Sequence, residues 1–297
     1  MPRVSVVEFT DPACPFAYSA EPVRWKLAWR FGDGLDHTVR MVGLARDAAA
    51  QEAKGFDAER NAAVLRHFDR YGMPLSTAER RAPAGSWDAC RLVVAARRVD
   101  EAAAVRVLRA LRVAGLAEAR PIDDPDVLAD VCEVAGLAPQ ELLARARDAS
   151  TEQAFRHDLE AARSPGPAAL ALDHKLADVE DDWDGEAGPS GRRYTCPTFV
   201  FTVHGENGTG DARIAEVPGF QPWAAVEAVL ANLAPGLERR PWPEDVAEVL
   251  RWAPVPPATQ EVAELLGLDD REEARARLRD AGAVEREVGT DAFWTLA

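Results

Sequence analysis

Residues 4–18, VSVVEFTDPACPFAY, decide how this chain of 297 residues begins to fold. The apolar alternation at 3–9 predicts a strand, and residues 15–31 predict a helix. Cys14 therefore stands at a strand-to-helix turn, followed by Pro15 at the first helical position, where the missing N–H costs nothing. Unpaired backbone N–H groups and the positive end of the helix dipole favour a thiolate there. We expect Cys14 to be a nucleophile with a lowered pKa.

The same N-terminal unit continues into a second strand at 37–43. Strand, helix and strand match a right-handed βαβ unit, whose two strands are parallel. Pro22 falls inside the predicted helix, where it removes the hydrogen bond to the Tyr18 carbonyl. We expect a kink at that point.

A second informative stretch lies near the other end of the chain, where residues 194–201 read YTCPTFVF. It places a Cys-Pro bond at the entry of an apolar strand. The order of strand, Cys-Pro turn, helix, long helical segment, two strands and final helix resembles the DsbA-like branch of the thioredoxin fold. That branch includes bacterial dithiol-disulfide isomerases, 2-hydroxychromene-2-carboxylate isomerases and kappa-class glutathione transferases. The resemblance covers about residues 3–235.

The resemblance implies an α/β protein with a thioredoxin-like fold and a large helical insertion. The thioredoxin-like domain would comprise residues 1–47 and 194–236, with the insertion at 48–193 and a small C-terminal module at 237–297. In thioredoxin folds a cis-proline lies against the nucleophilic cysteine, and these two positions match Pro197 and Cys14. The second redox cysteine of the family is replaced by Ala17, so a disulfide within this motif cannot form. The substrate-binding positions implied are Pro15, Phe16, Ala17, Pro197 and Thr198.

Cys196 precedes the cis-proline position, where a side chain of this fold points toward the active cysteine. Cys14 and Cys196 would form a noncontiguous redox pair if their Cβ atoms came within about 3.5–4.5 Å. The alternative is a small side chain that stands at 196 because it fits. Without a partner thiol, a mixed disulfide on Cys14 must be resolved by a small thiol. Glutathione or mycothiol is the co-substrate we expect, with no tightly bound cofactor.

Two functions are compatible with this resemblance. The first is a thiol-disulfide oxidoreductase or thiol-dependent isomerase that uses Cys14 as nucleophile, with Cys196 as the second catalytic residue and a small thiol or a protein thiol/disulfide as substrate. Kappa transferases and chromene isomerases commonly carry serine where this chain has Cys14, which favours exchange chemistry. The second is a non-catalytic protein-binding adaptor built on a DsbA-like scaffold. A low pKa of the Cys14 thiol would favour the first function.

Composition excludes several other classes. A net charge of −15 argues against nucleic acid, because phosphate binding depends on Lys and Arg, and against anionic membrane surfaces. No apolar run reaches the length of a membrane span, and no secretory signal precedes the first strand. We therefore expect a cytoplasmic protein, in which four cysteines are not a disulfide framework.

Cys90 and Cys132 lie in helical apolar patterns and are interpreted as buried structural residues. The scattered histidines predict no metal site.

The long middle part of the chain is helical in pattern. Pro125 and Pro139 each predict a helix start, with Gly136 ending the first of these helices, and residues 150–153 (STEQ) predict a capping box for a third. Residues 179–193 are acidic and turn-rich and predict a mobile linker, with a lid over the site as the alternative. Strands at 198–204 and 211–217, joined by the turn-rich residues 205–210, and a helix at 222–233 would complete the sheet.

The C-terminal residues 241–297 predict a module of their own. Helices at 259–266 and 270–281 and a hairpin around Gly289 give a winged-helix-like α+β plan. Thirteen acidic residues against six Arg and no Lys give this segment a net charge of −7, which argues against DNA binding. We expect it to pack on the thioredoxin-like body or to engage a protein partner through Phe293 and Trp294.

Overall fold

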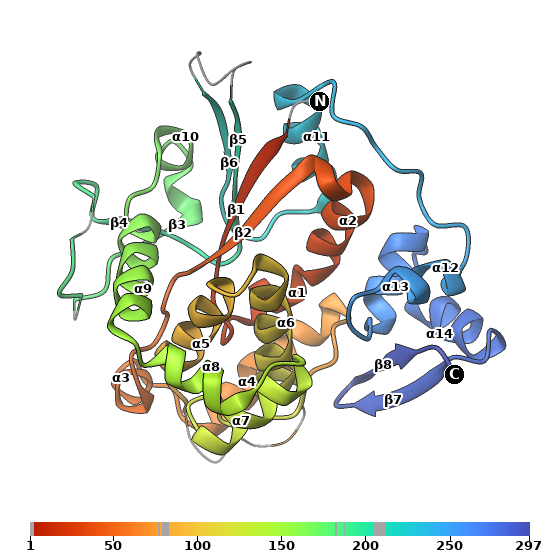
Figure 1. Ribbon diagram of the computed structural model, residues 1–297, viewed down its shortest axis with the longest axis horizontal. Helices are drawn as coiled ribbons and strands as arrows, with labels where there is room; N and C mark the ends of the chain where they lie inside the picture. Colours follow the sequence, from red (N-terminus) through yellow and green to blue (C-terminus); the bar gives the residue numbers. More distant parts are fainter. Residues whose placement is uncertain (1–2, 77, 79–82, 182, 187, 205–211) are drawn as a thin grey trace.

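The computed structural model describes residues 3–297 apart from 77, 79–82, 182, 187 and 205–211. Its centre is a four-stranded mixed sheet with the strand order β2-β1-β5-β6 (Figure 1). The strands are β1 (Val4–Thr10), β2 (Leu35–Met41), β5 (Thr198–Val203) and β6 (Arg213–Val217). β1 is parallel to β2 and antiparallel to β5, and β6 pairs antiparallel with β5. The expected parallel unit is confirmed, although β2 begins and ends two residues before the range predicted for it.

The helix after β1 is broken into two pieces instead of being kinked. α1 (Pro15–Ser19) and α2 (Glu21–Phe31) are separated at Ala20. Pro22 occupies the first turn of α2, where its missing N–H leaves no helical hydrogen bond unmade. The expected continuous helix over 15–31 is therefore wrong, because the proline starts a new helix.

The two faces of the sheet are covered by different helices. α2 and α11 (Trp223–Leu233) pack on one face, where Val4, Val6 and Phe201 form their core. Glu8 has the same parity in β1 as Val4 and Val6 and so points to this face, into a buried position. A charge in that position requires buried partners.

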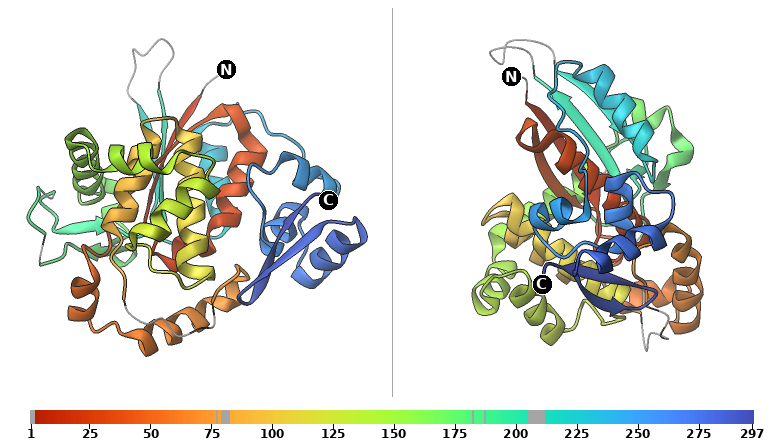
Figure 2. Two further views of the ribbon diagram at one scale, coloured as in Figure 1. Left: turned by 60° about the horizontal axis from the view of Figure 1, so that its bottom comes forward. Right: turned by 90° about the vertical axis from the view of Figure 1, so that its right-hand side faces the viewer.

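The segment between β2 and β5 is helical, as expected. Its helices are α3 (Ala48–Ala53), α4 (Ala58–Phe68), α5 (Trp87–Arg97), α6 (Glu101–Arg112), α7 (Pro125–Val134), α8 (Pro139–Ala146), α9 (Ala149–Ala162) and α10 (Pro167–Leu170). The predicted starts at Pro125 and Pro139 are confirmed. The capping box at 150–153 is wrong, because α9 already begins at Ala149 after the N-cap Asp148. α5, α6 and α9 pack around β2 (Figure 2, left).

A small sheet precedes β5. It pairs β3 (Leu176–Asp178) with β4 (Arg192–Tyr194), so the last two residues of the predicted 179–193 loop belong to a strand. The loop is therefore 179–191. The predicted connection at 205–210 lies outside the described residues. α11 starts one residue after its predicted start and ends where expected.

The C-terminal module contains three helices and a hairpin. α13 (Thr259–Leu266) has the predicted bounds, α14 (Arg271–Asp280) is one residue shorter at each end, and β7 (Val284–Val288) pairs with β8 (Asp291–Thr295). α12 (Val246–Trp252) was not predicted. The winged-helix assignment stays a prediction.

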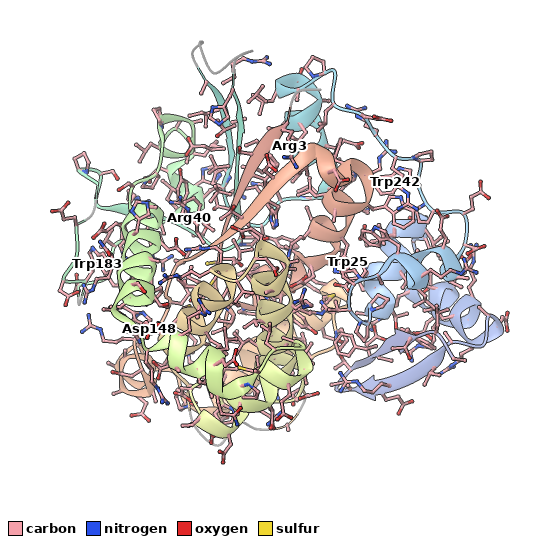
Figure 3. All side chains as sticks on the ribbon, in the orientation of Figure 1. Arg3, Trp25, Arg40, Asp148, Trp183 and Trp242 are labelled. Carbon is pink, nitrogen blue, oxygen red and sulfur yellow. The ribbon has the colours of Figure 1, made fainter. Side chains whose placement is uncertain are left out.

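This module packs on α2, as expected. Trp25 and Trp29 of α2 each meet Trp252 edge-on, with ring centroids 5.5 and 4.9 Å apart. Trp25 lies at the junction in Figure 3, and the module stands beside α2 in both views of Figure 2. Phe293 and Trp294 are buried, at 2% and 0% exposure. The aromatic end of the hairpin is thus covered by the chain itself.

Within the part of the chain that the structure describes, no helix is long and apolar enough to span a membrane.

A candidate active site around Cys14

The two cysteines predicted to form the site lie together. Cys14 is the N-cap of α1, and its thiol donates to the carbonyl oxygen of Cys196 at 3.6 Å. The pairing of β1 with β5, in which Phe9 lies opposite Thr198, brings the ends of these two strands into register. The Cys196-Pro197 peptide bond is cis, as the resemblance implied. Both cysteines are buried, at 6% exposure each.

The surroundings of the two thiols favour different protonation states. The hydrogen bond from the Cys196 thiol is the strongest influence on the pKa of Cys14 and lowers it, against the effect of burial. The N–H of Ala17 and the charge of Arg112 lower it further. Burial raises the pKa of Cys196 well above its ordinary value, and the neighbouring Cys14 raises it more. Of the two cysteines, Cys14 therefore loses its proton more readily than Cys196.

The other two cysteines have surroundings that favour the thiol. Burial and the carboxylate of Asp11 raise the pKa of Cys90 well above its ordinary value. Burial raises the pKa of Cys132 to about 11. Both are fully buried in the helical core, as expected for structural cysteines.

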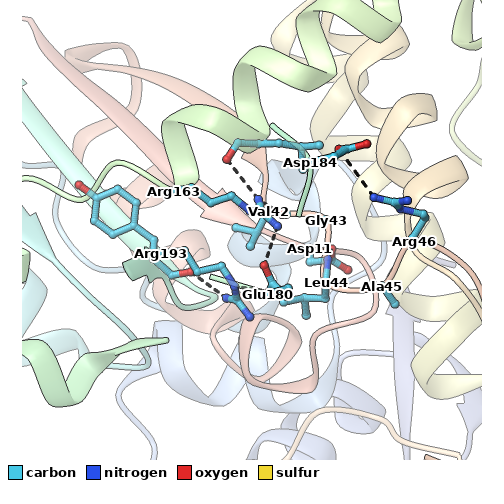
Figure 4. Close-up of polar contacts among 12 residues, drawn as sticks. Asp11, Val42, Gly43, Leu44, Ala45, Arg46, Arg163, Glu180, Asp184 and Arg193 are labelled. Carbon is cyan, nitrogen blue, oxygen red and sulfur yellow. Dashed lines mark hydrogen bonds and ion pairs between the residues drawn. The ribbon is translucent and has the colours of Figure 1, made fainter. Parts of the chain in front are cut away.

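Asp11 fixes the turn that carries Cys14. Its buried carboxylate accepts from the N–H groups of Ala13 and Leu44, both at 2.8 Å, and from the Ser86 hydroxyl at 3.0 Å. Asp11 thus joins the β1–α1 turn to the segment after β2, where Figure 4 shows it beside Leu44, and to the start of α5. Its negative charge acts against the Cys14 thiolate, and burial raises the pKa of Asp11 itself.

A cluster of buried charges lies near the turn that carries Cys14. Arg112 of α6, which has no exposed surface, pairs with Glu21 and lies 3.7 Å from Glu8. Arg24 pairs with both carboxylates, at 3.3 Å to Glu8 and 2.7 Å to Glu21. The cluster continues from α6 into the C-terminal module, where both guanidinium NH2 groups of Arg109 meet Glu261 at 2.7–2.8 Å. Removing one member would leave a buried charge unpaired.

Beside the active turn lies a cavity of about 1300 Å³. Ala13, Pro15 and Phe16, which flank Cys14 in the chain, line one side of it, and α3 and α4 line the other. Phe16 is 42% exposed and meets Phe68 of α4 edge-on, with centroids 4.6 Å apart. Cys14 itself is not a lining residue, although both of its neighbours in the chain are.

The remaining predicted binding residues have other roles in the structure. Ala17 is buried and offers its N–H to the Cys14 sulfur. Thr198 is buried and donates to the carbonyl of Thr195 at 2.6 Å while accepting from the N–H of Gly219 at 3.2 Å. It therefore holds the Pro197 loop from inside and does not line the cavity.

Sequence reasoning did not identify Asp11, Arg112, Phe68 and Arg193 as site residues. One signal was present: Glu8 is the only charge in the strand run VSVVEF, which indicates buried partners. Nothing in the sequence indicated that the partners would be Arg24 and Arg112.

The loop at 179–191 is attached at its start. Glu180 accepts from Arg163 at 2.9 Å and from Arg193 at 2.5 Å, the latter on β4 three residues before Cys196 (Figure 4). Burial raises the pKa of Glu180, but the two arginines outweigh it and keep the pKa below its ordinary value. Asp184 pairs with Arg46 at 3.7 Å. These contacts attach the loop next to the cavity, where Arg193 is a lining residue.

Among the described residues, no group of three or more His, Cys, Asp and Glu side chains is arranged to hold a metal ion.

Comparisons with solved structures place the fold. The chain is similar to a probable DsbA oxidoreductase from Streptomyces coelicolor, with 20% identity and a TM-score of 0.53 over 82% of this chain and 95% of that one. It is also similar to the cytosolic disulfide reductase DsbM from Pseudomonas aeruginosa, with 18% identity and a TM-score of 0.50 over 77% of this chain and 100% of that one. At these identities the likeness shows the fold alone.

A search of curated protein sequences gives no match. The family model described as a DSBA-like thioredoxin domain matches residues 5–166, more than half of the chain and the part that carries Cys14. The protein therefore belongs to the DSBA-like thioredoxin domain family.

Proposed function

We propose that this protein is a thiol-disulfide oxidoreductase in which Cys14 attacks a disulfide and Cys196 resolves the product. The observation that carries the proposal is the contact between the two cysteines, with a lowered pKa at Cys14 and a raised pKa at Cys196. The two roles need different pKa values. The nucleophile attacks as a thiolate, whereas the resolving cysteine stays protonated until the mixed disulfide has formed. We place this chemistry in the cytoplasm.

The reaction proceeds in two exchanges. The Cys14 thiolate attacks one sulfur of the substrate disulfide, so that a Cys14–substrate disulfide forms and the other half leaves as a thiolate. Cys196 then attacks the Cys14 sulfur and transfers its proton to the departing second half. The substrate gains two electrons, and a Cys14–Cys196 disulfide remains. A small thiol such as glutathione or mycothiol would reduce that disulfide and regenerate the enzyme.

The same thiolate could serve a thiol-dependent isomerase, since a mixed disulfide or adduct on Cys14 is common to both. The adaptor function has less support. Phe293 and Trp294, the apolar groups expected to meet a partner protein, are buried against this chain.

Trapping the intermediate tests the proposal. Wild-type protein treated with one equivalent of a disulfide should lose two hydrogen atoms in intact mass, with Cys14 and Cys196 linked in a peptide map. Cys196→Ser should instead accumulate the mixed disulfide on Cys14, and Cys14→Ser should not react. Cys132→Ser is the matched control, because its sulfur lies in the helical core.

Two results would contradict the proposal. A mixed disulfide that persists on Cys14 in the wild type, with Cys196 still reduced, would assign resolution to an external thiol. Equal reactivity of wild type and Cys14→Ser would remove the catalytic function and favour the adaptor.

A further inference from the structure

We propose that the cavity beside Cys14 binds small acidic disulfides, whose carboxylates are held by Lys54, Arg60 and Arg70. This inference rests on the proposed function and names the substrate class of the same site. It comes from the charges that line the cavity.

The cavity has the opposite charge balance to the chain. The whole chain carries 50 acidic residues against 35 Lys and Arg. The side chains lining the cavity reverse this excess: the cations are Lys54, Arg60, Arg70, Arg120 and Arg193, and the acids are Glu118 and Asp123. A positive cavity in a negative molecule selects anions by local potential.

Two of these cations have acidic partners, and the other three have none among the described residues. Arg120 pairs with Asp130, and Arg193 pairs with Glu180. Among the described residues, no carboxylate lies within ion-pair distance of Lys54, Arg60 or Arg70.

The contacts that the three cations do make are with neutral oxygens. Lys54 donates to the Leu44 carbonyl at 3.3 Å, Arg60 to the Gly55 carbonyl at 2.9 Å, and Arg70 to the Tyr71 hydroxyl at 2.9 Å. All three side chains are exposed, and these neutral contacts do not compensate their charges. An incoming carboxylate could therefore accept charge-assisted hydrogen bonds from them.

Lys54, Arg60 and Arg70, here called the cationic wall, are connected to the turn that carries Cys14. Leu44, which accepts from Lys54, donates its own N–H to Asp11 in the turn that carries Cys14. On the other side, Phe68 of α4 packs against Phe16, next to Pro15. The cavity thus runs from the turn to the cations with an aromatic stretch between them. A ligand that spans it would have a disulfide at one end, a short apolar stem and a carboxylate at the other.

The occupant is a small molecule, because the sulfur of Cys14 is recessed. Only 6% of the residue is exposed, which favours a slender substrate over the surface of a folded protein. The cavity of about 1300 Å³ exceeds the ~300–1,000 Å³ of typical ligand pockets, which leaves room for a peptide-sized disulfide. Of the two co-substrates considered above, glutathione carries carboxylates and mycothiol does not. As a substrate, a mixed disulfide of glutathione therefore fits the cationic wall better than one of mycothiol.

The chemistry at the sulfur is the first exchange of the proposed reaction. The Cys14 thiolate forms a bond to one substrate sulfur, the substrate S–S bond breaks, and the other half leaves as a thiolate. The cations take no part in bond making. They raise the local concentration of the acidic disulfide and orient it.

A series of three disulfides that differ in charge tests the proposal in the full-length wild-type protein. The probes are dithiodipropionate (dianion), bis(2-hydroxyethyl) disulfide (neutral) and cystamine (dication). The rate of Cys14 modification is followed by quenched intact mass and divided by the rate of the same disulfide with free 2-mercaptoethanol, which removes intrinsic reactivity. We expect the dianion to exceed the neutral probe by about tenfold at low salt and the dication to be slowest. The preference should shrink at about 0.5 M salt.

Substitutions test whether Lys54, Arg60 and Arg70 cause the preference for the dianionic disulfide. Lys54→Gln, Arg60→Gln and Arg70→Gln should each reduce the dianion rate about threefold, and the triple variant should bring it to the neutral level. The rate with the neutral probe should stay within about twofold of wild type. Arg66→Gln is the matched control: Arg66 is exposed on the same helix α4 but does not line the cavity. It should leave every rate unchanged.

The outcomes separate this inference from the proposed function. If the neutral probe modifies Cys14 but the dianion has no advantage in the wild type, the exchange chemistry stands and the acidic specificity is wrong. The specificity is also overturned if the triple variant keeps the preference, or if an acidic peptide disulfide gains an advantage that dithiodipropionate lacks. If no disulfide modifies Cys14, the proposed function fails and the inference fails with it.

Discussion

The Cys14 thiol donates to the carbonyl oxygen of Cys196 at 3.6 Å, although 182 residues separate the two cysteines in the chain. In a Cys-X-X-Cys motif the second sulfur comes from the same helical turn, and here that position holds Ala17. The strand pairing of β1 with β5 instead supplies a cysteine from the cis-proline loop. Sulfur chemistry at this site therefore depends on tertiary structure.

Cys196→Ala should raise the pKa of Cys14, because it removes the donor that lowers that pKa most. Cys196→Ser is the matched variant, since its hydroxyl still donates and should hold the pKa close to that of the wild type. The measurement is the rate of iodoacetamide alkylation against pH. The wild-type midpoint should lie below 9.0, the ordinary value for this group. Identical profiles for the alanine and serine variants would show that the Cys196 thiol does not stabilise the thiolate.

Glu261→Ala should strongly destabilise the protein. It leaves Arg109, which is only 4% exposed, as a buried charge without its bidentate partner. Losses of about 3–5 kcal/mol in the free energy of unfolding are typical of such deletions. Urea denaturation measures the loss. Glu287→Ala, at an exposed position of β7, is the control and should stay within about 0.5 kcal/mol of wild type.

The double variant Arg109→Met/Glu261→Met should recover much of that loss, because it removes both charges and fills the space with apolar atoms. If the double variant is as unstable as Glu261→Ala, the loss in free energy of unfolding comes from the missing ion pair and not from the unpaired charge of Arg109.

Glu8→Gln should change how stability depends on pH. Burial raises the pKa of Glu8, but Arg24, His37 and Arg112 outweigh it and hold the pKa below 4.5, the ordinary value. A carboxyl group with a lowered folded-state pKa stabilises the protein fully above its unfolded pKa and loses that contribution as the pH falls further. Wild type should therefore exceed Glu8→Gln in thermal midpoint at neutral pH, and the gap should narrow below about pH 4.5. Parallel curves down to about pH 3 would contradict this assignment.

Removing the C-terminal module, residues 241–297, should lower solubility and leave Cys14 reactivity almost unchanged. The deletion uncovers Trp25 and Trp29 on α2, which the module now covers. Arg112, the cation that acts on Cys14, keeps Glu8 and Glu21 as partners within the remaining chain. Light scattering and the alkylation rate of the soluble fraction check the two parts. A large change in that rate would mean that the module acts on the site through Arg109.

The full-length protein should not bind DNA through this module. Its net charge of −7 repels phosphates, so counterion release gives no gain. A fluorescence-anisotropy titration with duplex DNA at low salt is the measurement. Micromolar binding that weakens with salt would overturn this prediction.

The sequence by itself determined the local helices and strands and several of their boundaries. Alternation gave β1 and β5, prolines gave the starts of α7 and α8, and Gly267 gave the end of α13. Cys14 at the turn and Pro197 before the strand were sufficient to recognise the fold. These features depend on residues a few positions apart, so one segment contains all the information that determines them.

Only the tertiary structure decided the electrostatics of the site. The pKa of Cys14 depends on Asp11 and Ala17, three residues away on either side, but also on Cys196 and Arg112, which come from distant segments of the chain. The cationic wall at Lys54, Arg60 and Arg70 becomes part of the site because α3 and α4 pack opposite the active turn. Burial removes water, and a charge then responds to whichever groups the fold brings within a few ångströms. Sequence spacing does not contain that information, so Cys14 and its contact with Cys196 could be predicted, whereas Arg112 and the cations of the cavity could not.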